Sequence, residues 1–240
     1  MKTISAKGGL PSRNICISVA RPTTEEVVAC LENNREEADL FEIRLDSLHR
    51  IPDLSLFRRA TDKPLLFTCR PKWEGGTFDG EEKERQRILE EAVGTGADLI
   101  DLELRASEEM RHKMLAACSG SSCGLLLSWH DFTTTPSSQG LLSLFQQMYR
   151  SGAHFGKIIT TARDFKDVLR VLALQNEAQE MSFPLVAFCM GEIGKISRLA
   201  TLELGGFMTY AAPAAGAGSA PGQLSAVRLR QMLEMLHDAD

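Results

Sequence analysis

Apolar and polar positions along the chain alternate between two patterns. Short apolar runs rich in branched residues recur eight times, and each resembles a buried strand more than a helix. Between these runs, apolar residues recur at helical spacing. The eight predicted strands lie near residues 15–20, 39–46, 64–70, 97–104, 123–130, 154–160, 184–190 and 206–210.

Capping signals support the intervening helices. A hydroxyl or carboxylate side chain before a run of helix formers accepts a hydrogen bond from an unpaired backbone N–H. Acidic residues in the first turn interact favourably with the helix dipole. The predicted helix starts lie at residues 22–26, 80–85, 107–109, 137–138, 164 and 221–223. The last helix is predicted to continue to about Leu236.

This regular alternation predicts the fold. Eight β-α units without a composition break or linker indicate a single (β/α)8 TIM barrel over residues 1–240. Residues 1–14 precede the first strand, and a small plug under the barrel is one interpretation of them. The competing architecture is a doubly wound open sheet, which usually carries a glycine-rich phosphate turn after its first strand. Residues 19–22 contain no glycine.

Composition narrows the classes of function. The chain of 240 residues is 43% hydrophobic and 25% charged, as expected of a globular protein. Its net charge of −5, with scattered cations, argues against a nucleic-acid partner. We see neither an apolar run of about 18 residues nor an apolar N-terminal signal, so we expect no membrane association and a cytoplasmic location. The six cysteines lack metal-ligand spacing, which predicts small core residues in a reducing compartment and no metal.

Charged residues lie at alternate positions of several predicted strands, which would turn them into the barrel. Such a set is unusual because an unpaired buried charge costs several kcal/mol. Many of these residues fall at the C-terminal ends of strands, where barrel enzymes place their active sites. An interior ion-pair network that fixes strand register is the alternative. On the strands, Arg44, Arg70 and Lys157 oppose Glu42, Asp101 and Glu103. Glu74 and Arg198, from the segments after two strands, complete a set that suits a small polar substrate with an anionic group.

Lys157 is the strongest candidate for covalent chemistry. It lies in an apolar strand, where loss of hydration disfavours the ammonium and favours a neutral amine that attacks carbonyl carbon. Alternatively, it reaches water or pairs with a carboxylate. His130 ends the preceding strand, and neighbouring strands lie roughly 4.8 Å apart, so both side chains could reach one substrate. The histidine could then move a proton α to the carbonyl, although a structural core histidine is the commoner case.

An anion site is predicted at the last two barrel loops. A glycine-containing loop at residues 191–194 leads into a helix with Arg198 in its first turn. The helix N-terminus and the guanidinium both favour a carboxylate there. Ser219 and Gln223 could hydrogen-bond the same anion, although Ser219 could equally serve only as a helix cap.

Taken together, these segments resemble the type I 3-dehydroquinate dehydratase family. The resemblance covers nearly the whole chain, and its specificity lies in the order and spacing of the pieces. They are residues 42–46, 68–70, 74–76, 100–104 and 128–132, the strand of Lys157, residues 190–198 and residues 219–223. The resemblance implies a barrel that converts 3-dehydroquinate to 3-dehydroshikimate in the shikimate pathway, without metal or organic cofactor. It also implies a homodimer.

The resemblance further implies roles for individual residues. Lys157 would form an iminium with the C3 ketone, and His130 would remove the C2 proton and help the C1 hydroxyl leave in a syn elimination. Glu74 would hydrogen-bond His130. The predicted substrate-binding residues are Arg198, Ser219 and Gln223 at the carboxylate, and Glu42, Arg44, Arg70 and Ser18 near the ring hydroxyls. Asp101 and Glu103 would support them from behind.

Some positions depart from the family pattern. Ile43, Cys69 and Trp129 stand where tryptophan, phenylalanine and tyrosine are usual, respectively. Strand alternation turns all three away from the site, so we expect altered packing with retained chemistry. The small residues within 211–222 predict a mobile lid that orders over substrate, or simply a flexible loop.

Two other functions compete. A class I aldolase-type barrel also uses a lysine iminium, but it cleaves a carbon–carbon bond, often in phosphorylated sugars, and would need a phosphate cradle in place of a carboxylate grip. A non-catalytic quinate-sensing barrel would be expected to lose the lysine or the histidine. Both Lys157 and His130 are present.

Overall fold

The computed structural model of the chain describes residues 14–213 and 223–237. Eight strands alternate with helices, as the sequence predicts, and strand ends differ from prediction by only one or two residues in most cases. The strands are β1 (Asn14–Val19), β2 (Leu40–Arg44), β3 (Leu65–Thr68), β4 (Leu99–Glu103), β5 (Gly124–His130), β6 (Phe155–Thr161), β7 (Leu185–Met190) and β8 (Met208–Ala211).

Helices follow the strands and surround them. The α-helices are α1 (Thr24–Asn33), α2 (Ser55–Ala60), α3 (Glu82–Gly94), α4 (Glu108–Ser119), α5 (Ser138–Arg150), α6 (Phe165–Leu172), α7 (Leu174–Glu180), α8 (Lys195–Glu203) and α9 (Ala226–His237). Two short 3₁₀ helices, η1 (Leu45–Ser47) and η2 (Lys72–Glu74), follow β2 and β3. In the part of the chain that is described, no helix has the length and apolarity required to traverse a bilayer.

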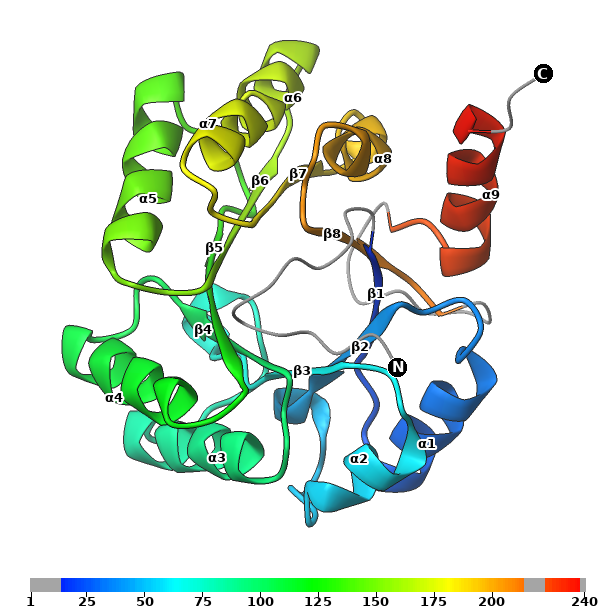
Figure 1. The fold of residues 1–240 in the computed structure, drawn as a ribbon, viewed down its shortest axis with the longest axis vertical. Helices are drawn as coiled ribbons and strands as arrows, with labels where there is room; N and C mark the ends of the chain where they lie inside the picture. Colours follow the sequence, from blue (N-terminus) through cyan, green and yellow to red (C-terminus); the bar gives the residue numbers. More distant parts are fainter. Residues whose placement is uncertain (1–13, 214–222, 238–240) are drawn as a thin grey trace.

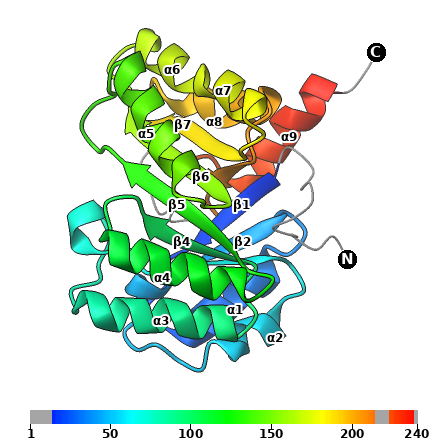
Figure 2. The ribbon, with the colours of Figure 1, turned by 60° about the vertical axis from the view of Figure 1, so that its left-hand side comes forward.

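The strands form a nearly closed parallel barrel. Hydrogen-bonded neighbours run from β7 through β6, β5, β4, β3 and β2 to β1, and β1 then pairs with β8. Figure 1 looks into the ring of strands and shows the helices around its outside, and Figure 2 shows α3, α4 and α5 covering one flank. Pairing between the first and last strands excludes the doubly wound open sheet and confirms the predicted barrel.

Apolar side chains form two separate layers, one on each face of the barrel wall. The outer layer, between strands and helices, includes Ile43, Cys69 and Trp129, so these three positions face away from the site as predicted. The inner layer fills the barrel with residues such as Leu40 and Leu66. Leu40 and Leu66 lie near the N-terminal ends of their strands, whereas inward polar residues gather near the C-terminal ends.

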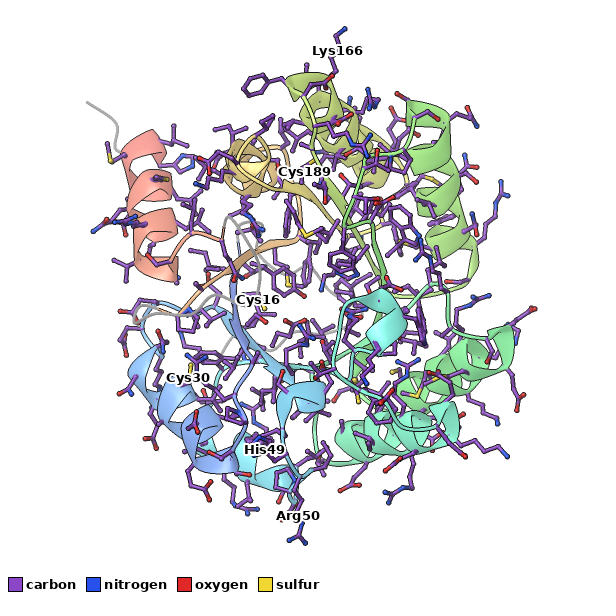
Figure 3. All side chains as sticks on the ribbon, turned by 180° about the vertical axis from the view of Figure 1, so that it is seen from behind. Cys16, Cys30, His49, Arg50, Lys166 and Cys189 are labelled. Atoms are coloured by element: carbon purple, nitrogen blue, oxygen red, sulfur yellow. The ribbon has the colours of Figure 1, made fainter. Side chains whose placement is uncertain are left out.

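The cysteines are core residues, as their sequence context predicts. All six are buried and free. Cys16 lies inside the barrel, whereas Cys30 and Cys189 pack between strands and helices (Figure 3).

The predicted caps are confirmed at four helices. The side chains of Thr23, Ser107, Ser137 and Asp164 each accept a hydrogen bond from a backbone N–H in the first turn of α1, α4, α5 and α6, respectively. Each bond satisfies one of the donors that a helix N-terminus leaves unpaired.

The start of the last helix is corrected. Helix α9 begins at Ala226, later than the predicted start at residues 221–223. The backbone of Ala212 accepts a hydrogen bond from the Ala226 N–H and donates one to Leu224, so this stretch extends β8 by a parallel bridge before the helix can begin. Pro221, Gly222 and the predicted plug at residues 1–13 lie outside the described residues; Asn14 belongs to β1.

Candidate active site

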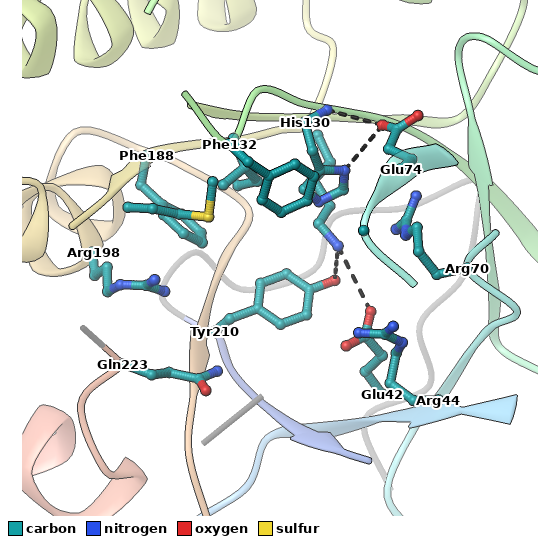
Figure 4. Close-up of a pocket in the computed structure, with 14 residues that line it drawn as sticks. Glu42, Arg44, Arg70, Glu74, His130, Phe132, Phe188, Arg198, Tyr210 and Gln223 are labelled. Atoms are coloured by element: carbon teal, nitrogen blue, oxygen red, sulfur yellow. Dashed lines mark hydrogen bonds and ion pairs between the residues drawn. The ribbon is translucent and has the colours of Figure 1, made fainter. Parts of the chain in front are cut away.

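A pocket opens at the C-terminal ends of the strands. It spans about 600 Å³, including space open to solvent, which is suitable for a small organic ligand. Eight of the ten predicted site residues line it: Glu42, Arg44, Arg70, Glu74, His130, Lys157, Arg198 and Gln223. Figure 4 shows them converging from strands and loops around the whole barrel.

Lys157 reaches into the pocket from the middle of β6. It is 4% exposed, which confirms the predicted loss of hydration. The amine nevertheless has partners, because Nζ lies 3.1 Å from Asp101 Oδ2 and 3.6 Å from Glu42 Oε1, and donates to Tyr210 Oη at 3.0 Å. The alternative interpretation, a lysine paired with carboxylates, therefore also describes this side chain.

Ser18 is the one described member of the predicted set that does not line the pocket. Its hydroxyl donates a very short hydrogen bond to Glu42 Oε2, and Thr68 Oγ1 donates to Oε1 at 2.9 Å. The register of β1, β2 and β3 places these groups side by side. Ser18 therefore holds the Glu42 carboxylate on the side away from the pocket. Direct contact between Ser18 and substrate stays a prediction.

A chain of buried ion pairs connects the lysine to the outer helices. Arg70 pairs with Asp101 and with Glu103, at 2.8 Å in each case. The other oxygen of Glu103 accepts a 2.6 Å bond from Arg85, which extends inward from α3 and is fully buried. The network predicted as the alternative interpretation is thus real, and it holds Asp101 against Lys157.

A second charge pair organises the loop beyond β3. Arg44 grips Asp46 with two hydrogen bonds, from Nε at 2.8 Å and from Nη2 at 2.7 Å. Asp46 also accepts from the backbone N–H groups of Arg70 and Thr77. Burial raises the pKa of this carboxyl, but Arg44 and the backbone donors outweigh burial and hold the pKa below its usual value. Asp46 therefore keeps the end of β2 and the β3–α3 loop together.

His130 and Glu74 form a pair at the pocket wall. Glu74 Oε1 accepts from the backbone N–H of His130 at 2.9 Å and lies 3.1 Å from the ring Nδ1 (Figure 4). When Glu74 is ionised, it therefore selects the tautomer with a proton on Nδ1, which leaves Nε2 as the basic nitrogen.

The protonation of this pair follows from burial and neighbouring charges. Burial, and then the cations Arg70 and Lys157, lower the pKa of His130 well below its usual value, so the ring is neutral near pH 7. Burial raises the pKa of Glu74 to about 7, against the opposing effect of Arg70. A neutral imidazole is the form that a general base requires.

A glycine and an aromatic ring interlock at the pocket mouth. Phe132 stacks on His130, with ring centroids 5.9 Å apart and planes within 10°. Gly75 has a positive φ of 76°, and a Cβ built there would lie 2.4 Å from the Phe132 ring. Only glycine fits both the backbone conformation and the space, so the ring can shield the imidazole.

Arg198 is a buried cation with a different environment. It lies in the first turn of α8 and is 2% exposed. Its guanidinium stacks on Phe188 at 4.5 Å, and no hydrogen bond or ion pair to it occurs within residues 14–213 or 223–237. Burial lowers the pKa of Arg198 to about 10. Because an unpaired buried cation is costly, this position is suited to an anionic ligand.

Sequence reasoning missed part of the lining. Tyr210, Phe188, Met190, Ile159 and Phe132 also face the pocket. Strand alternation gives each an inward position near a strand end, but an apolar or aromatic side chain there is equally typical of a barrel core. The sequence predicts the lid over residues 211–222, but Ala211 belongs to β8. Ser219 and the other lid residues from 214 to 222 lie outside the described residues.

The fold and the pocket define a class of protein. A parallel barrel with a buried lysine at its C-terminal mouth, a neutral histidine on the adjoining strand and an arginine without an ion pair among the described residues is typical of enzymes that act covalently on small anionic carbonyl compounds. The chain belongs to the type I 3-dehydroquinase family, whose sequence model matches residues 15–240.

Individual relatives agree with this assignment. The chain is 41% identical over 221 residues to a 3-dehydroquinate dehydratase of Desulfotalea psychrophila, covering 91% of this chain and 96% of the relative. It superposes on the crystal structure of a 3-dehydroquinate dehydratase from Geobacillus kaustophilus with a TM-score of 0.86, at 30% identity and over 99% and 100% of the two chains.

Another similar structure is the type I 3-dehydroquinate dehydratase of Clostridium difficile with covalently modified comenic acid. It gives a TM-score of 0.85 at 28% identity, over 95% of this chain and 94% of the other.

Proposed function

We propose that this chain is a lyase of the shikimate pathway that dehydrates 3-dehydroquinate to 3-dehydroshikimate through an iminium on Lys157. The observation that carries the proposal is the arrangement of three groups in one pocket. They are a buried amine on β6, a neutral imidazole two residues further along the paired strand β5, and, across the cavity, a guanidinium that forms no ion pair within residues 14–213 or 223–237.

Binding uses the unpaired cation first. The substrate carboxylate accepts hydrogen bonds from Arg198, with Gln223 beside it and Ser219 as a further predicted donor. This grip directs the ring toward the opposite wall, where Glu42, Arg44 and Arg70 meet its hydroxyl groups. A carboxylate ligand for Arg198 favours dehydration over the aldolase-type alternative, which would need a phosphate cradle.

Iminium formation follows at the C3 ketone. Lys157 first gives up a proton, for which Asp101 and Glu42 are the adjacent acceptors. The neutral amine attacks C3, the carbonyl π electrons move to oxygen, and this oxygen leaves as water after it is protonated. The resulting cationic nitrogen draws electrons from the C2–H bond, so the C2 proton becomes acidic.

Elimination uses the histidine as base and then as acid. His130 Nε2 takes the C2 proton, and the C2–H electrons form an enamine with the iminium carbon. Return of those electrons forms the new C1–C2 double bond and expels the C1 hydroxyl, which receives the proton from His130 and leaves as water. Glu74 holds the ring and stabilises its transient charge through Nδ1. Water then hydrolyses the iminium and frees Lys157.

Borohydride reduction tests the proposal. Borohydride added during turnover of 3-dehydroquinate should inactivate the protein and leave a reduced ligand adduct, which peptide mass mapping should place on Lys157. Omission of substrate should leave both the mass and the activity unchanged. Turnover without any trapped lysine would disprove the iminium mechanism.

Two further predictions concern the intact protein. We propose a homodimer, which sedimentation velocity would distinguish from a monomer. We also propose a cytoplasmic location, which fractionation of the source cells would test.

A further inference from the structure

Tyr210 touches the reacting nitrogen and has no role in the mechanism above. It lies on β8, and its side chain points into the barrel and is 6% exposed. Lys157 Nζ donates to Tyr210 Oη at 3.0 Å and sits 4.2 Å from the centre of the ring. Figure 4 shows the phenol extending across the cavity until its hydroxyl meets the same nitrogen that pairs with Glu42.

Iminium formation requires a hydrogen-bond donor beside that nitrogen. When Nζ attacks, the ketone oxygen gains negative charge, and it must later leave as water. Asp101 and Glu42, when ionised, only accept hydrogen bonds, so they cannot stabilise this oxygen. Among the described contacts of Nζ, Tyr210 supplies the hydroxyl. Since Oη accepts the bond from Nζ, its own proton can be donated to an oxygen bound next to Nζ.

The tyrosine remains a donor throughout the neutral pH range. Burial, and then the charge of Glu42, raise the pKa of Tyr210 well above its usual value. The phenol therefore keeps its proton at the pH at which the lysine must react. The mechanism above uses His130 at C2 and C1.

We infer that Tyr210 is a further catalytic residue, whose hydroxyl donates a hydrogen bond to the C3 oxygen as Lys157 adds to the ketone. The inference rests on the proposed function. The Nζ–C3 bond forms while the C=O π pair moves to oxygen, where Tyr210 stabilises the charge. One proton lost from nitrogen then reaches this oxygen, and the proton that Lys157 first gave to Asp101 or Glu42 supplies the second. The C3–O bond breaks to release water, and the phenol keeps its own proton. Hydrolysis of the product iminium uses the same contact in reverse.

The test separates adduct formation from elimination. Excess enzyme is mixed with 3-dehydroquinate, and samples are quenched with borohydride at successive times. Mass spectrometry then gives the mass of the adduct on Lys157. The dehydrated adduct is lighter than the substrate adduct by one water, so one time course reports both steps. Tyr210→Phe, which removes only the hydroxyl, should slow the appearance of total adduct about 100- to 1,000-fold. Conversion of the heavier adduct into the lighter one should change less than about twofold.

The other tyrosine provides a matched control. Tyr149 is 42% exposed on α5, so Tyr149→Phe should leave both steps at the wild-type rate. Adduct that appears at the wild-type rate in Tyr210→Phe would overturn the inference. Equal slowing of both steps would also overturn it, because the hydroxyl would then only position the lysine. Turnover by the wild-type enzyme without any adduct would instead disprove the iminium mechanism of the proposed function.

Discussion

The two sides of the pocket differ in how their charges are compensated. On the side formed by β3, β4 and β6, Arg70 and Lys157 each meet carboxylates within 3.1 Å. On the side formed by β7 and α8, Arg198 rests on the Phe188 ring without an anion among the described residues. Both sides are almost completely buried. A buried charge alone therefore does not identify a ligand contact. A buried charge without an ion-pair partner in the protein is the better indicator.

The largest expected effect comes from removing the covalent group. Lys157→Met keeps the side-chain volume but cannot form an iminium, so turnover of 3-dehydroquinate should fall at least about 10⁴-fold. A spectroscopic assay of product formation measures it. Lys166→Met is the control, because Lys166 extends from the outside of α6, far from the barrel interior (Figure 3), and should keep full activity. Substantial turnover by Lys157→Met would show that Lys157 is not the covalent catalytic residue.

Next in size is the loss of a compensated charge. Arg70→Met leaves Asp101 and Glu103 without their shared cation, so the free energy of unfolding should fall by about 3–5 kcal/mol. Urea unfolding measures the change. Arg59→Met removes an exposed ion pair with Asp53 and should alter stability by less than about 1 kcal/mol. Equal small losses in both variants would mean that the buried network does not stabilise the barrel.

Removal of the uncompensated charge should weaken substrate binding without lowering stability. Arg198→Met deletes the proposed carboxylate contact, so KM for 3-dehydroquinate should rise roughly 30- to 1,000-fold. Its free energy of unfolding should stay constant or increase, since a costly buried cation has gone. Steady-state kinetics and urea unfolding measure the two quantities. A stability loss as large as that of Arg70→Met would contradict the contrast between the two sides.

The smallest effect concerns protonation of Glu74, whose folded pKa of about 7 exceeds the ordinary carboxyl value of 4.5. Between these values the folded protein keeps a proton that the unfolded chain has lost, so wild-type stability falls as pH rises through this window. Glu74→Gln cannot ionise. Its stability relative to wild type should therefore increase by about 1–3 kcal/mol from pH 5 to pH 8, as followed by urea unfolding.

An exposed acid serves as the reference for that comparison. Glu36→Gln, which changes a carboxyl on the surface, should give a stability difference from wild type that varies little with pH. A pH-independent difference in Glu74→Gln as well would show that burial does not perturb this carboxyl.

The sequence predicted the barrel and the catalytic set because both depend on local patterns. Strand alternation turned Glu42, Lys157 and His130 inward, and position near strand ends brought them to one mouth. Tyr210 obeys the same alternation, but its partner lies 53 residues away, and no local pattern reveals that contact. Arg85 was missed for another reason. A charged residue of an amphipathic helix is normally expected in solvent, yet this one enters the barrel wall to reach Glu103.

The absence of a side chain at Gly75 leaves room for the Phe132 ring at the mouth of the pocket. Alanine at this position would press its methyl group into the Phe132 ring and drive the ring from its place over His130. The displacement would leave the imidazole of His130 more open to bulk water. A single hydrogen atom in place of a methyl group at Gly75 therefore keeps the Phe132 ring over the imidazole.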